Sequence, residues 1–300
     1  MQLRDIEYFA VVAEHGNLRR ASEALGLSHP ALSKSLRRLE NSMRAKLVER
    51  RPKGVTLTPV GAALLAQVRR LRLTLLDIRR EAEDLSQGLA GHLRIGVGAT
   101  TVEDLPEGCA TLLKKAPNLT AQIIVADNDV MVPALCNGEL DLIFNVIPDV
   151  PYAGCVQEHL FDDVFVVCAS PDHRLARRKR VPLAELAHER WTLSAPAVLN
   201  VQHLHQVFQA NGLPAPRVSI EARPLGLRLQ LCASTNLLSF SARRTLQLLA
   251  PRCRLKELPI KELEWRRAVG VIYRNESYLS PAARRLIGLL KAAVFQVARH

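Results

Sequence analysis

The sequence predicts an α/β protein built from two dissimilar parts. Up to residue 58, apolar residues recur at three- and four-residue spacing and are interrupted at Gly16 and Gly26, which predicts a cluster of short helices. From residue 90 onward, β-rich runs alternate with helical patterns. Such alternation predicts an α/β architecture with a largely parallel sheet. A long heptad pattern over 59–89 separates the two parts.

Composition and charge narrow the class of protein. The chain has 300 residues, 48% of them hydrophobic, which is enough for more than one domain. Its formal net charge of +12 favours a polyanionic partner, either nucleic acid or an anionic membrane. No apolar run approaches the roughly 20 residues that span a bilayer, and Met1 leads into a charged segment instead of a signal peptide. We therefore expect a cytoplasmic protein with no membrane partner.

The N-terminal part has the start and stop signals of three helices. Gly16 can end the first helix in a left-handed conformation, and Asn17 is a competent N-cap for the second. Gly26 then ends the second helix. Ser28 can cap a third helix, in which Pro30 occupies a position where its missing N–H costs little.

The third helix is predicted to present a polar and basic face. Leu32, Leu36 and Leu39 form its buried stripe, which leaves hydroxyl, imidazole and cationic groups outside. Such a face suits the DNA major groove, where polar groups meet base edges and cations meet phosphates. The alternative is a solvated basic face on an ordinary three-helix bundle. We predict DNA contacts from Ser28, His29, Pro30, Ser33, Lys34, Arg37 and Arg38.

The stretch "LVERRPKGVTLTPVG" (47–61) reads as a basic β-hairpin, or wing. Two short extended pieces flank a Pro-Lys-Gly turn, in which Gly54 tolerates positive φ. Arg50, Arg51 and Lys53 at the tip are expected to contact phosphates beside the groove, adding affinity without sequence information.

The order of helix, helix-turn-helix, wing and a long helix opening at Thr58-Pro59 resembles the LysR-type transcriptional regulators. The resemblance is carried by "ASEALGLSHPALSKSLRRLE" (21–40), "GVTLTPVG" (54–61), "GELDLIF" (138–144) and "YLSPAARRL" (278–286). It implies a winged helix-turn-helix domain over 1–58, a linker helix over 59–89 and an effector-binding domain over 90–300. The effector domain would have two lobes like those of periplasmic solute-binding proteins, with lobe I over 90–162 and 267–300 and lobe II over 163–266.

The sequence departs from the family pattern at three places. His29 replaces a glutamine that could offer a donor and acceptor pair to adenine. Met43-Arg44 stands where a Leu-Gly pair commonly closes the recognition helix, and Val48 where phenylalanine is frequent. We expect the first change to alter base preference at one position and the other two to be local packing adjustments.

The linker helix carries a regular apolar seam with alternating steps of four and three residues, which favours a partner helix over packing on the chain's own core. The resemblance adds that such helices pair antiparallel, giving homodimers that pair again into homotetramers. The seam consists of Leu64, Val68, Leu71, Leu75, Ile78, Ala82, Leu85 and Leu89.

Polar residues follow the predicted strands of the remaining chain. The strands are predicted at 92–98, 120–126, 140–146, 165–169, 190–195, 218–222, 237–241 and 268–273. Ligands in open α/β sheets bind beyond the carboxyl ends of strands and at helix N-termini. Hydroxyl, amide and guanidinium groups converging on a cleft would suit a small organic anion. We predict effector contacts from Thr100, Thr101, Asn128, Asn145, Ser194, Asn200, Val201 and Arg223.

The sequence favours regulation over catalysis. It contains no nucleophile elbow, P-loop or metal-ligand spacing, so we expect no catalytic residue, cofactor or metal. The predicted function is a DNA-binding regulator controlled by a small organic effector. One alternative is a regulator of the same architecture switched by two of the six scattered cysteines. Another is a solute-binding module with no DNA role.

Overall fold

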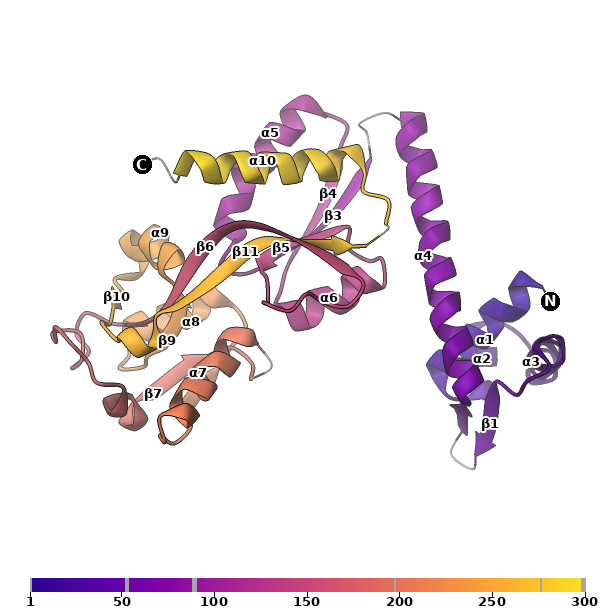
Figure 1. Cartoon of the computed structure of the whole chain (residues 1–300), viewed down its shortest axis with the longest axis horizontal. Coiled ribbons are helices and arrows are strands. Elements are labelled where there is room, and N and C mark those ends of the chain that lie inside the picture. The colour runs from indigo at the N-terminus through magenta and orange to yellow at the C-terminus, as the bar shows by residue number, and fades with distance from the viewer. Residues whose placement is uncertain (1, 52–53, 88–90, 197, 276, 298–300) are drawn as a thin grey trace. The chain divides into compact units, whose positions relative to one another are not determined.

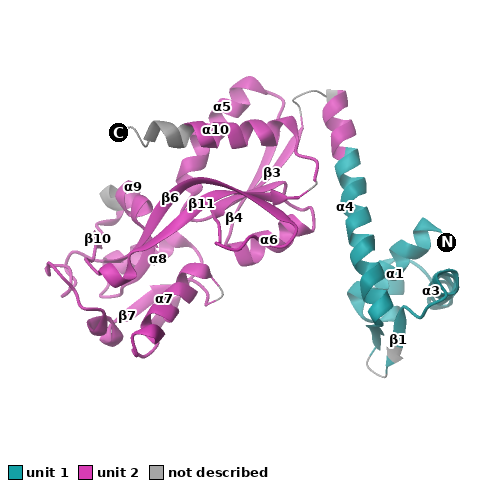
Figure 2. Cartoon of the chain, in the orientation of Figure 1, with its two compact units in different colours: residues 1–79 teal, residues 80–300 magenta. Residues whose placement is uncertain are grey.

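A computed structural model describes residues 2–51, 54–87, 91–196, 198–275 and 277–297. Contacts divide the chain into two compact units, residues 1–79 and 80–300, coloured separately in Figure 2. The fold class expected from the sequence is confirmed: an N-terminal helix-turn-helix part and a two-lobed α/β part.

The N-terminal unit packs three helices and a hairpin around one core. It contains α1 (Leu3–His15), α2 (Leu18–Ala24), α3 (His29–Met43), β1 (Val48–Arg51), β2 (Gly54–Leu57) and the greater part of α4 (Pro59–Gln87). Leu32, Leu36 and Leu39 are buried, as predicted for the inner stripe of α3. They pack with Phe9 of α1 and Leu47, which precedes the hairpin, in a single apolar cluster.

The predicted helix caps are confirmed. Gly16 ends α1 with φ of 58°, and the Asn17 side chain accepts hydrogen bonds from the backbone N–H groups of the first turn of α2. The Oγ of Ser28 accepts from the N–H of Ala31 at 3.3 Å and so caps α3. Arg44 ends α3 in the left-handed region, with φ of 51°. An arginine therefore adopts the conformation for which glycine is best suited.

The hairpin is fixed to the turn between α1 and α2. Strands β1 and β2 pair antiparallel, with Val48 opposite Leu57. The N–H of Val55 donates to the carbonyl of Gly16 at 2.7 Å. Gly54 has φ of 137°, and a Cβ there would lie 2.3 Å from that same carbonyl oxygen. The close approach therefore requires glycine at the position that the sequence assigned to the turn.

Helix α4 begins inside the N-terminal core and then leaves it. The Thr58 hydroxyl caps the helix by accepting from the N–H of Gly61 at 3.0 Å. Val68, one of the predicted seam residues, is only 3% exposed because it packs in the N-terminal core. The later seam residues Leu71, Leu75 and Ile78 are 40%, 45% and 56% exposed. The first part of the seam therefore packs within its own unit, contrary to the expectation for Val68, and Leu89 lies outside the described residues.

The second unit is built on a mixed sheet. The strands of the second unit are β3 (His92–Val97), β4 (Thr120–Val125), β5 (Leu142–Val146), β6 (Cys155–Ala169), β7 (Arg190–Leu193), β8 (Arg217–Glu221), β9 (Ser239–Ala242), β10 (Lys256–Glu257) and β11 (Trp265–Arg274), of which β7 and β8 pair apart from the main sheet. The main sheet has the order β10-β6-β11-β5-β3-β4, with β9 on β6. Strand β3 pairs parallel with β4 and β5, whereas β11 pairs antiparallel with β5 and β6. The expectation of a largely parallel sheet was therefore wrong.

The long strands β6 and β11 run through both lobes (Figure 1). Helices α5 (Leu105–Lys115), α6 (Asn128–Cys136) and α10 (Pro281–Val297) belong to the first lobe, and α7 (Leu199–Ala210), α8 (Leu225–Ser234) and α9 (Arg243–Cys253) to the second. Short 3-10 turns stand at Val102–Asp104, Leu183–His188 and Lys261–Leu263. The sequence predicted only 165–169 of β6, because the earlier half of that strand is half-exposed and rich in charged residues.

Two of the sequence motifs hold the last turns of α4 within the second unit. Asp141 of "GELDLIF" receives the Arg80 guanidinium at 2.8 Å and the backbone N–H of Arg94 at 2.7 Å. Tyr278 of "YLSPAARRL" donates its hydroxyl hydrogen to Asp84 at 3.0 Å. Arg80 and Asp141 are only 14% and 13% exposed. The motifs therefore attach the helix to the first lobe by ion pairing and hydrogen bonding.

Candidate functional site

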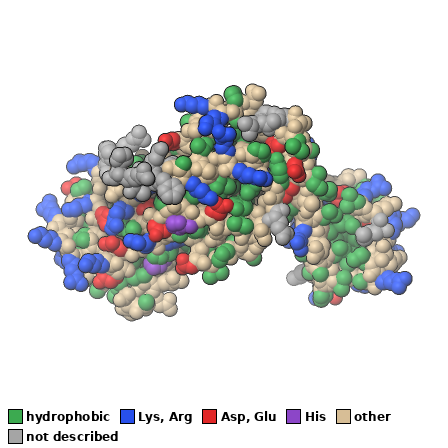
Figure 3. All heavy atoms as spheres, turned by 45° about the horizontal axis from the view of Figure 1, so that its top comes forward, with side chains coloured by type: hydrophobic (Ala, Val, Ile, Leu, Met, Phe, Trp, Pro, Cys, Tyr) green, Lys and Arg blue, Asp and Glu red, His purple; other side chains and the backbone are tan. Residues whose placement is uncertain are grey.

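The outer face of α3 combines exposed polar and cationic side chains. Ser28, His29, Pro30, Lys34 and Arg37 are all exposed. They project from a helix whose opposite face is packed in the core. In the space-filling view of Figure 3, lysine and arginine side chains are also prominent on the surface of the N-terminal unit. The face therefore offers donors and positive charge to a large external partner.

Arg38 has a structural partner that the sequence pattern did not indicate. Its Nε donates to Oδ2 of Asp5 at 2.8 Å, and the Ser35 hydroxyl donates to Oδ1 at 2.6 Å. Asp5 is fully buried in α1. The hydrogen bonds from Arg38 are the main reason why the pKa of Asp5 is lowered to about 2. Arg38 therefore joins α3 to α1, although its side chain is still 45% exposed.

The remaining residues predicted to contact DNA are not all free to face an external partner. Ser33 is half-buried, and its Oγ finds no hydrogen-bond partner among the described residues, so it does not project outward as expected. Arg51 donates to Glu49 and to the Thr56 hydroxyl within the hairpin. The side chain of Arg50 and the whole of Lys53 lie outside the described residues.

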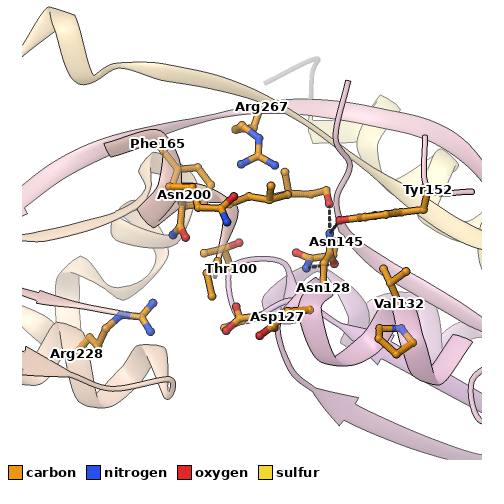
Figure 4. Close-up of a pocket in the computed structure, with 17 residues that line it drawn as sticks. Thr100, Asp127, Asn128, Val132, Asn145, Tyr152, Phe165, Asn200, Arg228 and Arg267 are labelled. Carbon is orange, nitrogen blue, oxygen red and sulfur yellow. Dashed lines mark hydrogen bonds between the residues drawn. The ribbon is translucent and has the colours of Figure 1, made fainter. Parts of the chain in front are cut away.

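A pocket in the second unit brings together residues from both lobes (Figure 4). Its volume is about 410 Å³, in the range of small-molecule sites. Four of the predicted effector residues line it: Thr100, Asn128, Asn145 and Asn200. The remaining lining residues are Ala99, Asp127, Asp129, Val132, Pro133, Val146, Tyr152, Phe165, Val198, Leu199, Gln202, Arg228 and Arg267.

Hydrogen bonds fix the amide groups on the first-lobe wall. The Nδ2 of Asn145 donates to Oδ1 of Asn128 at 2.7 Å. The Nδ2 of Asn128 donates to the carbonyl of Val146 at 2.9 Å and to the Tyr152 hydroxyl at 3.2 Å. A Cβ on Gly98 would lie 1.8 Å from the Asn145 side-chain oxygen. The absence of a side chain at Gly98 therefore makes room for this amide.

The other four predicted effector residues do not line the pocket. Thr101 is 2% exposed and donates to the carbonyls of Gly98 and Phe144. Val201 is buried in α7. Ser194 and Arg223 both contact the Asp127 carboxylate of the opposite lobe. None of these four side chains is therefore placed to contact a molecule inside the pocket.

Arg223 forms a bridge between the lobes. It lies 3.3 Å from Asp127 and 2.9 Å from Asp129. Hydrogen bonding from Arg223 lowers the pKa of Asp129, whereas burial raises the pKa of Asp127. A residue predicted to hold the effector thus instead joins the two lobes beside the pocket.

Two arginines that the sequence analysis did not select are buried in the pocket wall. Arg228 is 4% exposed, and its Nη1 donates to the backbone carbonyls of Ala222 and Arg223 at 2.8 and 2.7 Å. Arg267 is 7% exposed, and burial lowers its pKa to about 10. Arg228 lies inside α8, and Arg267 stands one position before the strand predicted at 268–273, so neither residue follows a predicted strand. Charged residues in otherwise buried segments were the signal that could have revealed them.

Four of the six cysteines form two neighbouring pairs, Cys168 with Cys232 and Cys136 with Cys155. The Sγ of Cys232 lies 3.4 Å from the carbonyl oxygen of Cys168, and both residues are buried. Burial and the neighbouring Cys136 raise the pKa of Cys155 to about 11. Among the described residues, no group of three His, Cys, Asp or Glu side chains could hold a metal ion. None of the helices in the described part of the chain is both long and apolar enough to cross a membrane.

Comparison with known proteins agrees with both parts of the fold. Residues 3–62 match "Bacterial regulatory helix-turn-helix protein, lysR family", and residues 86–294 match "LysR substrate binding domain". The chain is 29% identical over 296 residues to the transcriptional regulator GbpR of Azospirillum brasilense, covering 98% of this chain and 86% of GbpR. It is 27% identical over 301 residues to the hydrogen peroxide-inducible genes activator of Escherichia coli O6:H1, covering 97% and 95%.

Solved structures show the same architecture. Full-length CbnR in complex with its target DNA matches with a TM-score of 0.61 at 20% identity, covering 98% of this chain and all of that one. At this identity the likeness establishes the fold, while the two family matches together cover most of the sequence. The chain therefore belongs to the LysR family of bacterial transcriptional regulators, which are DNA-binding proteins with an effector-binding domain and not enzymes.

Proposed function

We propose that the exposed face of α3 enters the major groove of an operator and reads its bases. The observation that carries this proposal is the exposure of His29, Lys34 and Arg37 on a helix whose leucines are buried behind them. Arg37 can donate to base edges, and Lys34 can meet phosphates. The basic wing adds phosphate contacts beside the groove. The protein acts in the cytoplasm, where the operator lies.

Operator binding uses a homodimer or homotetramer joined through α4. Leu71, Leu75, Ile78 and Leu85 support this, because they leave apolar surface exposed along the helix. Apolar residues at heptad spacing bury this surface by pairing with a second helix. Two winged domains then bind a partly palindromic site, and each strengthens the binding of the other.

The pocket between the lobes binds a small organic anion that controls the regulator. Its volume suits a metabolite, and Arg228 and Arg267 contribute two buried guanidinium groups to its wall. The effector acts by binding one arrangement of lobes and subunits better than the other, because a ligand shifts an equilibrium only through differential affinity. The proposed domain boundaries are 1–58, 59–89 and 90–300, with the lobes exchanging near residues 162 and 266.

Selection of duplexes from a random pool tests the DNA proposal. We expect an enriched, partly palindromic sequence, and a screen of metabolites should then find acids that shift the footprint on it. A pool with no enrichment would contradict sequence-specific binding. A footprint that is unchanged by every metabolite would contradict control by an effector.

A second candidate is control by thiol oxidation. Cys136 and Cys155 are neighbours, and one relative is a hydrogen peroxide-inducible genes activator. Oxidation of both thiols by peroxide would form a disulfide and two water molecules. The raised pKa of Cys155 opposes this, because the thiolate is the reactive form. Mass spectrometry after peroxide treatment separates the candidates: a Cys136–Cys155 disulfide together with an altered footprint supports the switch, and unchanged thiols exclude it.

A further inference from the structure

We propose that Arg267 and the Tyr152 hydroxyl form the seat for a single carboxylate of the effector, and that Trp265 and His203 hold this seat in place. This inference rests on the proposed role of the pocket as an effector site. It goes further by naming the effector as a small monocarboxylic acid with an apolar body.

Arg267, unlike Arg228, makes no side-chain hydrogen bond with any of the residues that the structure describes. Its side chain is buried and faces the cavity (Figure 4). Asp149 attracts it only from a distance, and no ion pair joins it to any of the residues that the structure describes. A buried cation without a partner is unfavourable, so a bound anion would be strongly favoured there.

Tyr152 supplies the second donor of the seat. Its oxygen accepts the hydrogen bond from Asn128 at 3.2 Å, which leaves the phenolic hydrogen free to point elsewhere. Figure 4 shows Tyr152 and Arg267 reaching toward the same cavity from different walls. A guanidinium and a hydroxyl together match the acceptor oxygens of a carboxylate.

The rest of the wall limits the effector to one acidic group. Arg228 already donates to two backbone carbonyls, and the carboxylate of Asp127 attracts its positive charge. Asp127 and Asp129 line the same cavity and share the single Arg223 guanidinium, so the negative charge that remains on them would repel a second carboxylate. Phe165, Val132, Pro133 and Leu199 provide apolar surface for the remainder of the molecule.

A stack of three planar groups holds the seat. The Arg267 guanidinium carbon lies 3.9 Å from the centroid of the Trp265 ring. The His203 ring stacks on Trp265 with centroids 3.8 Å apart and planes 9° from parallel. His203 lies in α7, and the first residues of this helix line the pocket. Trp265 and His203 are therefore positioning residues, which link the carboxylate seat on β11 to a helix of the second lobe.

Fluorescence of Trp265 can report the binding directly. The chain has two tryptophans, so Trp191→Phe leaves Trp265 as the sole reporter in the full-length protein. The probes are benzoate, phenylacetate and hexanoate, with benzamide as the neutral control and succinate as the dicarboxylate. We expect saturable changes in emission with the monocarboxylates and none with benzamide. Calorimetry on the wild-type protein gives the same test if Trp191→Phe lowers the thermal midpoint.

Substitutions locate the seat. Arg267→Gln should weaken monocarboxylate binding by at least about tenfold, in line with the loss of a hydrogen bond to a charged group. Arg266→Gln removes the same charge from the adjacent, exposed position on β11 and should leave affinity unchanged. Trp265→Leu should weaken binding severalfold, measured by calorimetry, and Trp265→Phe should restore most of it because a ring is retained.

The outcomes separate this inference from the proposed function. Equal binding of benzamide, equal effects of Arg266→Gln and Arg267→Gln, or tighter binding of succinate would overturn the carboxylate seat. So would the absence of binding by every monocarboxylate while another metabolite still shifts the operator footprint. If no metabolite of any charge shifts the footprint, the effector role of the pocket itself is wrong.

Discussion

Arginines of the N-terminal unit and of the effector domain lie in opposite surroundings. On α3, Arg37 is exposed above a buried leucine stripe. In the effector domain, Arg228 and Arg267 are less than 10% exposed and line the pocket. Exposed cations serve a large polyanion whose own counterions are released on binding. A buried cation is accessible only to groups of its own chain or to a small anion that enters the protein.

The same comparison separates binding residues from structural ones. Arg38 and Arg223 have strong acidic partners within the chain, Asp5 in one case and Asp127 with Asp129 in the other. Arg37 and Arg267 have no ion pair with any described residue of the chain. Under the proposed function, the presence of an acidic partner, more than a position in a pattern, distinguishes an arginine that holds elements together from one that binds DNA or an effector.

The largest expected effect concerns the exposed seam of α4. Replacing Leu71 and Leu75 together with glutamate should produce monomers and reduce operator affinity by about a hundredfold or more, because two linked binding domains would no longer act together. Sedimentation and fluorescence anisotropy measure the two effects. Leu248→Glu, at an exposed leucine on α9, is the control and should change neither. Dimers of normal affinity in the double variant would contradict the role of the seam.

The next effect compares two exposed arginines of the N-terminal unit. Arg37→Ala should reduce specific operator affinity by about 1–3 kcal/mol, because a base contact is lost. Arg69→Ala, at an exposed position on α4, should have little effect. Anisotropy with the selected duplex and with a scrambled one checks this. Equal losses for both variants would show that only general charge matters.

A buried pair should contribute more to stability than an exposed one. Asp5→Asn should destabilise the protein by about 2 kcal/mol, because Arg38 and Ser35 lose a charged acceptor. Glu23→Gln, which breaks the exposed pair with Arg19, should cost less than about 0.5 kcal/mol. Thermal and urea unfolding measure both. Similar losses for the two variants would contradict the structural role of Asp5.

The same pair predicts a dependence of stability on pH. Arg38 lowers the pKa of Asp5 from its ordinary value near 3.8 to about 2. The stabilisation from Asp5 is therefore fully present above about pH 4 and is lost as pH falls toward 2. Urea unfolding of the N-terminal unit between pH 5 and 2.5 should show a steeper loss for wild type than for Asp5→Asn. An equal loss of stability with falling pH in wild type and Asp5→Asn would contradict the contribution of the Asp5–Arg38 pair.

The smallest expected effect concerns the end of α3. Arg44 has φ of 51°, in the left-handed region. Arg44→Gly should stabilise the N-terminal unit by about 0.5 kcal/mol, because the relief of strain exceeds the added entropy of the unfolded chain. Asn41→Gly, inside the same helix, should instead destabilise by about 1 kcal/mol. Urea unfolding of the two variants measures both changes in the free energy of unfolding, which should have opposite signs.

Local signals predicted the N-terminal unit well. Asn17 and Ser28 cap the helices as expected, and the leucine stripe of α3 is buried. Each of these features depends on residues that are close together in the chain, so a single sequence is enough to predict it. The pairing of Asp5 with Arg38 did not follow, because thirty-three positions separate the partners.

The pocket was harder to predict, because the residues that line it are also far apart in the sequence. Thr100 follows a strand, Asn128 and Asn200 lie at the starts of helices, Asn145 lies near the end of β5, and all four line the cavity. Arg267 lies within a strand, and its exposure to the pocket depends on how β11 crosses between the lobes. The antiparallel pairing of β6 with β11 was missed because charged residues mask the earlier half of β6. Both features depend on strand pairing between distant segments and on the direction of side chains, which a local sequence pattern does not determine.

The salt dependence of operator affinity tests the central claim most directly. With the selected duplex, anisotropy should show log K falling linearly with log salt, and Lys34→Ala should reduce the slope by about one, because one phosphate contact is lost. The Glu23→Gln control should keep the wild-type slope. Binding that does not respond to salt, or a Lys34→Ala slope equal to that of wild type, would contradict the placement of the α3 face on DNA.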